Sequence, residues 1–141
     1  MILYAESSAI VAWLFAEPAG ETVRQLLQQA THVLTSQLTP LECHRALQRG
    51  LALGRLQEAQ VGNLRAQLAR SSETWTWLTP TSEALERAGN PFPVEPVRTL
   101  DAVHLASALV ARSEQPDIEL LSLDERVRRN AQALGFAVRP D

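Results

Sequence analysis

Short apolar runs alternate with longer amphipathic stretches along this sequence. Runs of strand length cover residues 2–5, 33–35, 75–78, 120–123 and 136–138, and at least one stretch of helix length separates each from the next. Parallel strands need such crossovers, which are usually helices. We therefore predict an α/β fold, a three-layer α/β/α sandwich with a mainly parallel central sheet, formed by residues 1–141 as a single domain.

The stretches between these runs carry apolar residues at helical spacing. Helices are predicted over residues 8–15, 20–30, 39–53, 57–70, 82–88, 99–111 and 124–134. The first contains Trp13, Leu14 and Phe15 in succession. Because successive residues of a helix point in different directions, we expect at least one of the three to lie near the surface, where it would suit an interface.

Composition limits the possible functions. The formal net charge is −3, so any nucleic-acid binding must be local or assisted by a metal. All 13 basic residues are arginines, which excludes Schiff-base chemistry and the Walker-A phosphate loop. The single cysteine, Cys43, excludes an internal disulfide and a cysteine-based zinc site. With no basic signal-peptide start and no apolar run of membrane length, we expect a cytoplasmic protein without membrane contact.

Four acids occupy one kind of position in the predicted fold. Glu6 follows the first predicted strand, and Asp124 follows the fourth. Glu42 and Asp101 each lie near the start of a predicted helix. Strand ends and helix starts collect along one edge of a parallel sheet, so we expect the four carboxylates to share one cleft.

Grouped carboxylates repel one another, and a hard divalent cation removes that cost. Mg²⁺ prefers oxygen ligands and usually binds through a few carboxylates together with substrate phosphate. Two such ions can stabilise both the attacking and the leaving oxygen of a phosphodiester. The pattern therefore indicates metal-dependent phosphodiester cleavage that needs no histidine or lysine base.

Each acid also has a structural interpretation. Glu6 and Asp124 could cap helices, and the segment Thr39–Glu42 fits a capping box. Asp101 suits the positive end of a helix dipole. Apolar residues surround Asp101 in the sequence, however, and a charge in such surroundings is costly unless it is paired.

Two histidines lie near these acids, and a carboxylate–histidine metal site is an alternative. His44 is two residues from Glu42, a spacing that turns the two side chains in different directions on a helix. His104 lies one turn from Asp101, and we expect it to orient its neighbours through hydrogen bonds.

The segments around the four acids resemble, in order, the motifs of PIN domains. The first is Tyr4-Ala-Glu-Ser-Ser-Ala-Ile-Val11, an acid followed by a hydroxyl residue and Ser-Ala. The others are Leu38–Arg45, Arg98–Ala108, and Leu121–Arg126 with Ala133–Phe136. The resemblance spans residues 1 to 139, and within the family it is to the VapC toxins of toxin–antitoxin pairs.

This resemblance implies a Mg²⁺- or Mn²⁺-dependent endoribonuclease with an RNA substrate, a VapB-like antitoxin as partner, and a homodimeric state. It implies metal-binding acids at Glu6, Glu42, Asp101 and Asp124, with Ser8 matching the hydroxyl that orients them. The first acid of the family is usually aspartate. Glu6 places its carboxylate one methylene farther from the backbone.

Three other functions are consistent with parts of this pattern. A PIN-fold module that has lost activity could bind RNA or a protein partner, and Glu6 is the feature that supports it. A metal hydrolase of small phosphate esters would use the same acids. A receiver-like phosphoacceptor domain would place acids at the same sheet edge, but the lack of lysine argues against it.

Overall fold

Five strands form one sheet in a computed structural model that describes residues 1–141. All pairings are parallel, and the strands lie in the order β3-β2-β1-β4-β5. They are β1 (Ile2–Ala5), β2 (His32–Ser36), β3 (Thr76–Leu78), β4 (Ile118–Leu121) and β5 (Val138–Arg139). The predicted parallel sheet is confirmed.

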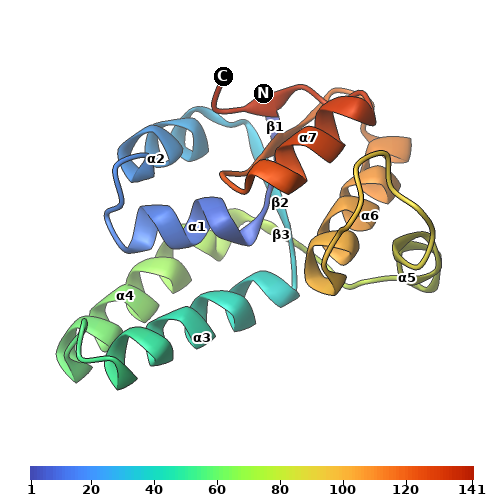
Figure 1. Ribbon diagram of the computed structural model, residues 1–141. Coiled ribbons are helices and arrows are strands. Elements are labelled where there is room, and N and C mark those ends of the chain that lie inside the picture. Colours follow the sequence, from blue (N-terminus) through green and yellow to red (C-terminus); the bar gives the residue numbers. More distant parts are fainter.

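Helices cover both faces of this sheet (Figure 1). They are α1 (Ser7–Leu14), α2 (Gly20–Gln29), α3 (Leu38–Ala52), α4 (Glu58–Ser71), α5 (Ser82–Ala88), α6 (Thr99–Glu114) and α7 (Glu125–Ala133), with a 3₁₀ turn at Ser72–Thr74. Helices α1 to α4 lie on one face and α5 to α7 on the other, which is the predicted three-layer sandwich. None of these helices combines the length and apolar character needed to cross a bilayer.

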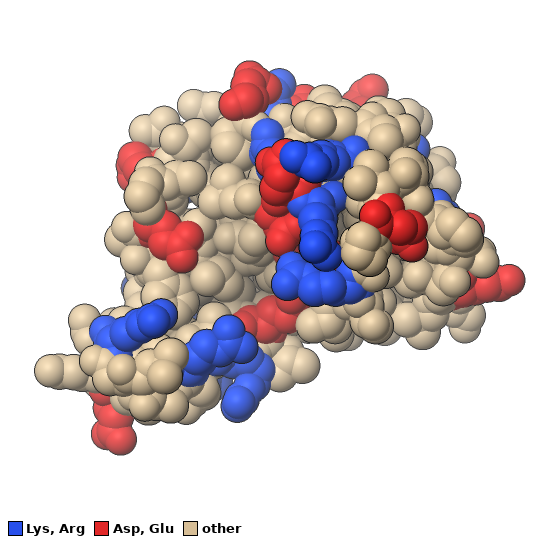
Figure 2. All heavy atoms as spheres, viewed as in Figure 1, with Lys and Arg blue, Asp and Glu red and all other residues tan.

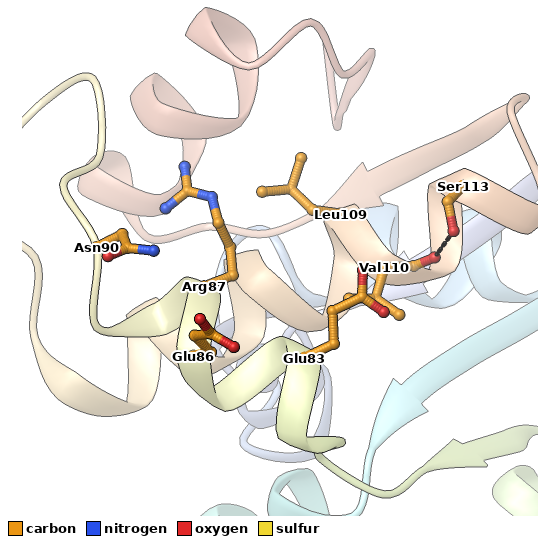
Figure 3. Close-up of a pocket in the computed structure, with 7 residues that line it drawn as sticks. All are labelled: Glu83, Glu86, Arg87, Asn90, Leu109, Val110 and Ser113. Carbon is orange, nitrogen blue, oxygen red and sulfur yellow. Dashed lines mark hydrogen bonds between the residues drawn. The ribbon is translucent and has the colours of Figure 1, made fainter.

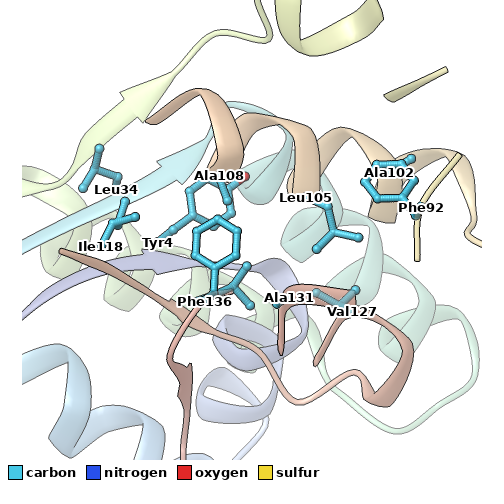
Figure 4. Close-up of a cluster of buried hydrophobic side chains, with 11 residues drawn as sticks. Tyr4, Leu34, Phe92, Ala102, Leu105, Ala108, Ile118, Val127, Ala131 and Phe136 are labelled. Atoms are coloured by element: carbon cyan, nitrogen blue, oxygen red, sulfur yellow. The ribbon is translucent and has the colours of Figure 1, made fainter. Parts of the chain in front are cut away.

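Side chains alternate across the strands, so each face of the sheet has its own core. On β1, Leu3 packs with residues of α1 and α2, whereas the next residue, Tyr4, is buried against α6 and α7 on the opposite face. Figure 4 shows the second core, in which Tyr4 belongs to one buried cluster with Leu105 of α6 and Val127 of α7. Burial on both faces explains why β1 is continuously apolar in sequence.

Two strands begin two residues away from their predicted starts, and β2 and β3 differ from the prediction by one residue. β4 begins at Ile118, two residues earlier than expected, and β5 comprises Val138 and Arg139 where the pattern favours residues 136–138. An apolar residue stands at position 136 because Phe136 packs in the core. Its ring centroid lies 4.0 Å from the guanidinium carbon of Arg112. Phe136 lies outside the strand because Gly135, with φ at +87°, turns the chain out of α7.

The three consecutive apolar residues at the end of α1 are not all buried. Leu14 is buried, whereas Trp13 and Phe15 are only half-buried. The prediction that at least one of the three lies near the surface is confirmed.

The strand order fixes where a ligand site can form. From β1 the chain builds outward through β2 and β3 on one side, and later through β4 and β5 on the other. The connections that leave the carboxyl ends of β1 and β4 therefore diverge, which makes this edge the switch point at which open parallel sheets bind ligands. Glu6 follows β1 at this point, and Asp124 lies three residues beyond β4.

Candidate active site

Glu6 is the most buried of the four acids, with 2% of its surface exposed. Its Oε1 accepts hydrogen bonds from the Ser7 hydroxyl at 2.7 Å and the Ser8 backbone N–H at 3.1 Å. Its Oε2 accepts from the hydroxyls of Ser8 and Ser122. Glu6 thus caps α1, as one interpretation of the sequence proposed, and three hydroxyl groups fix its carboxylate.

Ser7 connects Glu6 to Glu42. Its hydroxyl oxygen lies 2.7 Å from Glu6 Oε1 and 2.9 Å from Glu42 Oε2. Because a hydroxyl has one proton to donate, the two carboxylates share a single donor. Glu6 and Glu42, 36 residues apart in sequence, are therefore neighbours separated by one oxygen atom.

The capping-box interpretation of Thr39–Glu42 is wrong. Helix α3 begins at Leu38, with Gln37 as its N-cap, so Thr39 lies inside the helix. The Thr39 hydroxyl instead accepts a hydrogen bond from Thr35 at 2.7 Å. Glu42 is consequently free of capping and turns its carboxylate toward Ser7 and His104.

His104 is fully buried and holds Glu42 from α6. Its Nε2 lies 2.5 Å from Glu42 Oε1, and its Nδ1 lies 2.9 Å from the Tyr4 hydroxyl. With Nε2 donating to the carboxylate, the Nδ1 of a neutral ring accepts from Tyr4. Burial lowers the pKa of His104, but the Glu42 hydrogen bond and the negative charges of Glu6, Glu42 and Asp101 outweigh it, so the pKa lies above its ordinary value. The expected orienting role of His104 is confirmed.

Asp124 is held by its own helix. Its Oδ1 accepts hydrogen bonds from the backbone N–H groups of Arg126 and Val127, both at 3.0 Å, so the predicted N-cap of α7 is confirmed. Its own N–H donates to the hydroxyl oxygens of Ser8 at 3.2 Å and Ser122 at 3.1 Å. These two serines also contact Glu6, so they join the first and fourth acids.

Arg98 bridges the remaining two carboxylates. Its Nε donates to Asp101 Oδ2 at 2.9 Å, and its Nη2 donates to Asp124 Oδ2 at 3.1 Å. The arginine side chain is 67% exposed, whereas that of Asp101 is 11% exposed. Burial raises the pKa of Asp101, and the hydrogen bond and positive charge of Arg98 only partly offset the increase.

The structure thus brings all four acids into one connected set of contacts at the carboxyl ends of β1 and β4. The set runs from one acid to the next through Glu42, Ser7, Glu6, Ser8 and Ser122, Asp124, Arg98 and Asp101. In Figure 2 acidic and basic side chains lie against one another near the centre of the view, over the junction of α1, α6 and α7.

This arrangement is looser than a preformed metal cage. No three of the His, Cys, Asp and Glu side chains are close enough together to hold a metal ion. Serine hydroxyls occupy the oxygens of Glu6, and the Arg98 guanidinium bridges Asp101 and Asp124. The donor types nevertheless fit Mg²⁺ or Mn²⁺, because carboxylate oxygens are the ligands that these ions prefer.

Several residues of this site escaped the sequence analysis. Ser7 and Ser122 bind Glu6, and Arg98 pairs two of the acids. The pairing of Arg98 with Asp101 could have been found from the sequence, because residues three apart are neighbours on a helix. Cys43 has no chemical role at the site, since it is buried and burial raises the pKa of its thiol to about 12.

One pocket is separate from the four acids. It has a volume of about 420 Å³ and lies between α5 and α6 (Figure 3). Two of its polar groups are already engaged, since Arg87 donates to the Pro91 carbonyl and the Ser113 hydroxyl to the Val110 carbonyl. Its lining contains none of the four acids, so the switch point of the sheet is the better candidate site.

Comparison with known proteins identifies the family. The model of the PIN domain family matches residues 3–133. This chain is a PIN domain. Two ribonucleases of Mycobacterium tuberculosis are similar to it over nearly their whole length. VapC35 is 31% identical across 97% of this chain and 95% of its own length, and VapC46 is 35% identical across 96% and 95%.

Solved structures agree on the fold of the PIN domain. The crystal structure of VapC20 from Mycobacterium tuberculosis, described as a toxin that cleaves the sarcin–ricin loop, superposes with a TM-score of 0.67 at 18% identity, covering 96% of both chains. VapBC2 from Rickettsia felis, bound to a DNA fragment from its promoter, gives a TM-score of 0.61 at 10% identity, covering 99% of this chain and 98% of the other.

Proposed function

We propose that this PIN domain is a divalent-cation-dependent endoribonuclease and the toxin of a toxin–antitoxin pair. The observation that carries the proposal is that four acids from distant segments belong to one connected set of contacts at the switch point of the sheet. The similarity to the VapC35 and VapC46 ribonucleases supports RNA as the substrate.

The residues that would hold the cation are Glu6, Glu42, Asp101 and Asp124. Mg²⁺ or Mn²⁺ bound there would stabilise negative charge on the scissile phosphate and make a bound water more acidic. The chain supplies the positioning. Three serine hydroxyls hold Glu6, and His104 holds Glu42. These hydrogen bonds fix the orientation of the Glu6 and Glu42 carboxylates.

Cleavage of RNA by the purified chain tests this proposal. A 5′-labelled single-stranded RNA should be cut in the presence of Mg²⁺ or Mn²⁺, left intact in excess EDTA, and cut again when metal is restored. The Asp101→Asn variant, purified in parallel, controls for a contaminating nuclease. Cleavage that continues unchanged in EDTA would contradict the proposal.

A module that binds RNA or a protein without cutting is the second candidate. The burial of Glu6 among hydroxyl groups and the pairing of Arg98 with two acids favour it, because both leave the carboxylates satisfied without a cation. RNA that is retained but never cleaved, whatever metal is added, would support this candidate.

A toxin of this kind needs a partner that neutralises it, and we infer a VapB-like antitoxin. An antitoxin arginine could pair with Asp101 and Asp124 in the way that Arg98 does here. Expression of the chain alone should arrest bacterial growth, and co-expression of the antitoxin encoded beside it should restore growth. Growth unaffected by the toxin alone would oppose this role. A homodimer stays a prediction.

A further inference from the structure

The hairpin of α3 and α4 carries positive charge that the rest of the chain does not share. Residues 38–71 contain five arginines and two glutamates, a net charge of +3, whereas the whole chain carries −3. Figure 2 shows basic side chains gathered over this hairpin, at the lower left of the view. The hairpin is therefore a local basic surface on an acidic protein.

The arginines of the hairpin have no acidic partners. All five are exposed, and none forms an ion pair: Arg45, Arg49, Arg55, Arg65 and Arg70. By contrast, Arg24 on α2 is paired with Glu21, and Arg98 is paired with two acids of the site. The guanidinium groups of the hairpin keep their charge available for a partner.

Two of these arginines lie beside the candidate active site. Arg45 and Arg49 of α3 line a groove of about 320 Å³ together with Glu42, Leu41 and Leu100. The two arginines are four residues apart, so they stand one above the other, about 6 Å apart along the helix axis. The groove therefore leads from an acid of the site along the basic face of α3.

Glu42 does not neutralise this groove, although it precedes Arg45 by only three residues. Its carboxylate is turned inward, to Ser7 at 2.9 Å and His104 at 2.5 Å. The positive charge of Arg45 and Arg49 therefore faces the groove uncompensated, next to a cluster of acids.

We propose that this groove binds the RNA strand beside the scissile bond, with Arg45 and Arg49 contacting its phosphates. The inference rests on the proposed function and states where the substrate lies. Four carboxylates repel a polyanion, so attraction must come from groups close to the site. Arginine suits this role, because its planar guanidinium can bind phosphate through two hydrogen bonds. Leu41 and Leu100, 57% and 46% exposed, give the groove apolar walls for sugars or bases.

Salt-dependent RNA binding tests the inference without any need for cleavage. Fluorescence anisotropy with a labelled single-stranded RNA, recorded in EDTA, would compare wild type with an Arg45→Gln, Arg49→Gln double variant. Each phosphate contact contributes about 0.7 to the slope of log K against log salt, so the double variant should lose about 1.4 of slope and roughly 25-fold in affinity at 0.1 M salt. Arg24→Gln is the control for loss of an arginine outside the groove. Arg24 lies on α2 with its side chain 41% exposed, and the variant should bind RNA as wild type does.

The remaining outcomes separate this inference from the proposed function. A double variant with Arg45→Lys and Arg49→Lys should keep most of the slope, because charge is retained. If the glutamine variant, folded by circular dichroism, binds RNA with the wild-type slope, the groove does not bind the strand, even if the protein cleaves RNA. If the glutamine variant no longer binds the antitoxin but binds RNA as wild type does, the groove binds the protein partner and the inference is overturned. Arginine-dependent binding by a chain that never cleaves would support the inference while contradicting the nuclease.

Discussion

Replacing Asp101 with asparagine should reduce RNA cleavage about 100-fold or more while leaving the fold intact. The change removes the charge of one proposed ligand and almost none of its volume. The asparagine oxygen can still accept the hydrogen bond that Arg98 Nε now donates at 2.9 Å. Loss of an outer partner of a metal ligand already costs 10- to 100-fold, so loss of a ligand charge should cost at least as much.

Initial cleavage rates at saturating Mn²⁺, together with urea unfolding curves, measure this effect. Asp117→Asn provides the control, since Asp117 is exposed and lies before β4, outside the contacts of the site. Wild-type cleavage by a well-folded Asp101→Asn variant would mean that Asp101 serves only the packing of α6 and its pairing with Arg98.

Replacing Arg98 with glutamine should raise the affinity of the site for Mn²⁺ about tenfold. Arg98 pairs with Asp101 and Asp124, so a cation bound to both must displace the guanidinium. Two ion pairs made by a largely exposed arginine contribute about 1 kcal/mol together, which corresponds to roughly fivefold in apparent affinity. Removal of the positive charge itself adds to the gain.

Titration calorimetry of Mn²⁺ binding distinguishes competition from a general charge effect. Arg126→Gln is the matched control, because Arg126 is exposed on α7 and forms no ion pair. If Arg98→Gln gains no more affinity than Arg126→Gln, Arg98 does not compete for the site. If it binds Mn²⁺ more weakly than wild type, Arg98 positions the carboxylates for the cation.

The parts of the fold that depend on periodicity could be predicted from the sequence. Strand β1 and helix α5 agree with the prediction to the residue, because an apolar run and a capped amphipathic segment each mark them locally. β5 could not be placed in this way. The apolar character of Phe136 reflects packing below Arg112 and not membership of the sheet.

The candidate site likewise has a part that could be predicted from the sequence and a part that could not. The four acids were predictable as a group, because strand ends and helix starts meet at one edge of a parallel sheet. The hydrogen-bond partners of the four acids could not be predicted. Ser122 binds Glu6 across 116 positions of sequence, and which hydroxyl reaches which oxygen depends on side-chain geometry that no spacing rule encodes. The capping box at Thr39–Glu42 failed because α3 starts one residue before Thr39.

The central claim is that one divalent-cation site forms where Glu6, Glu42, Asp101 and Asp124 meet. Anomalous diffraction from crystals grown with Mn²⁺ tests it most directly. We predict a manganese peak within ligand distance of at least two of these carboxylates, with the Arg98 guanidinium withdrawn from Asp101 and Asp124. No peak at saturating Mn²⁺, with Arg98 still bridging the two aspartates as it does now, would contradict the account.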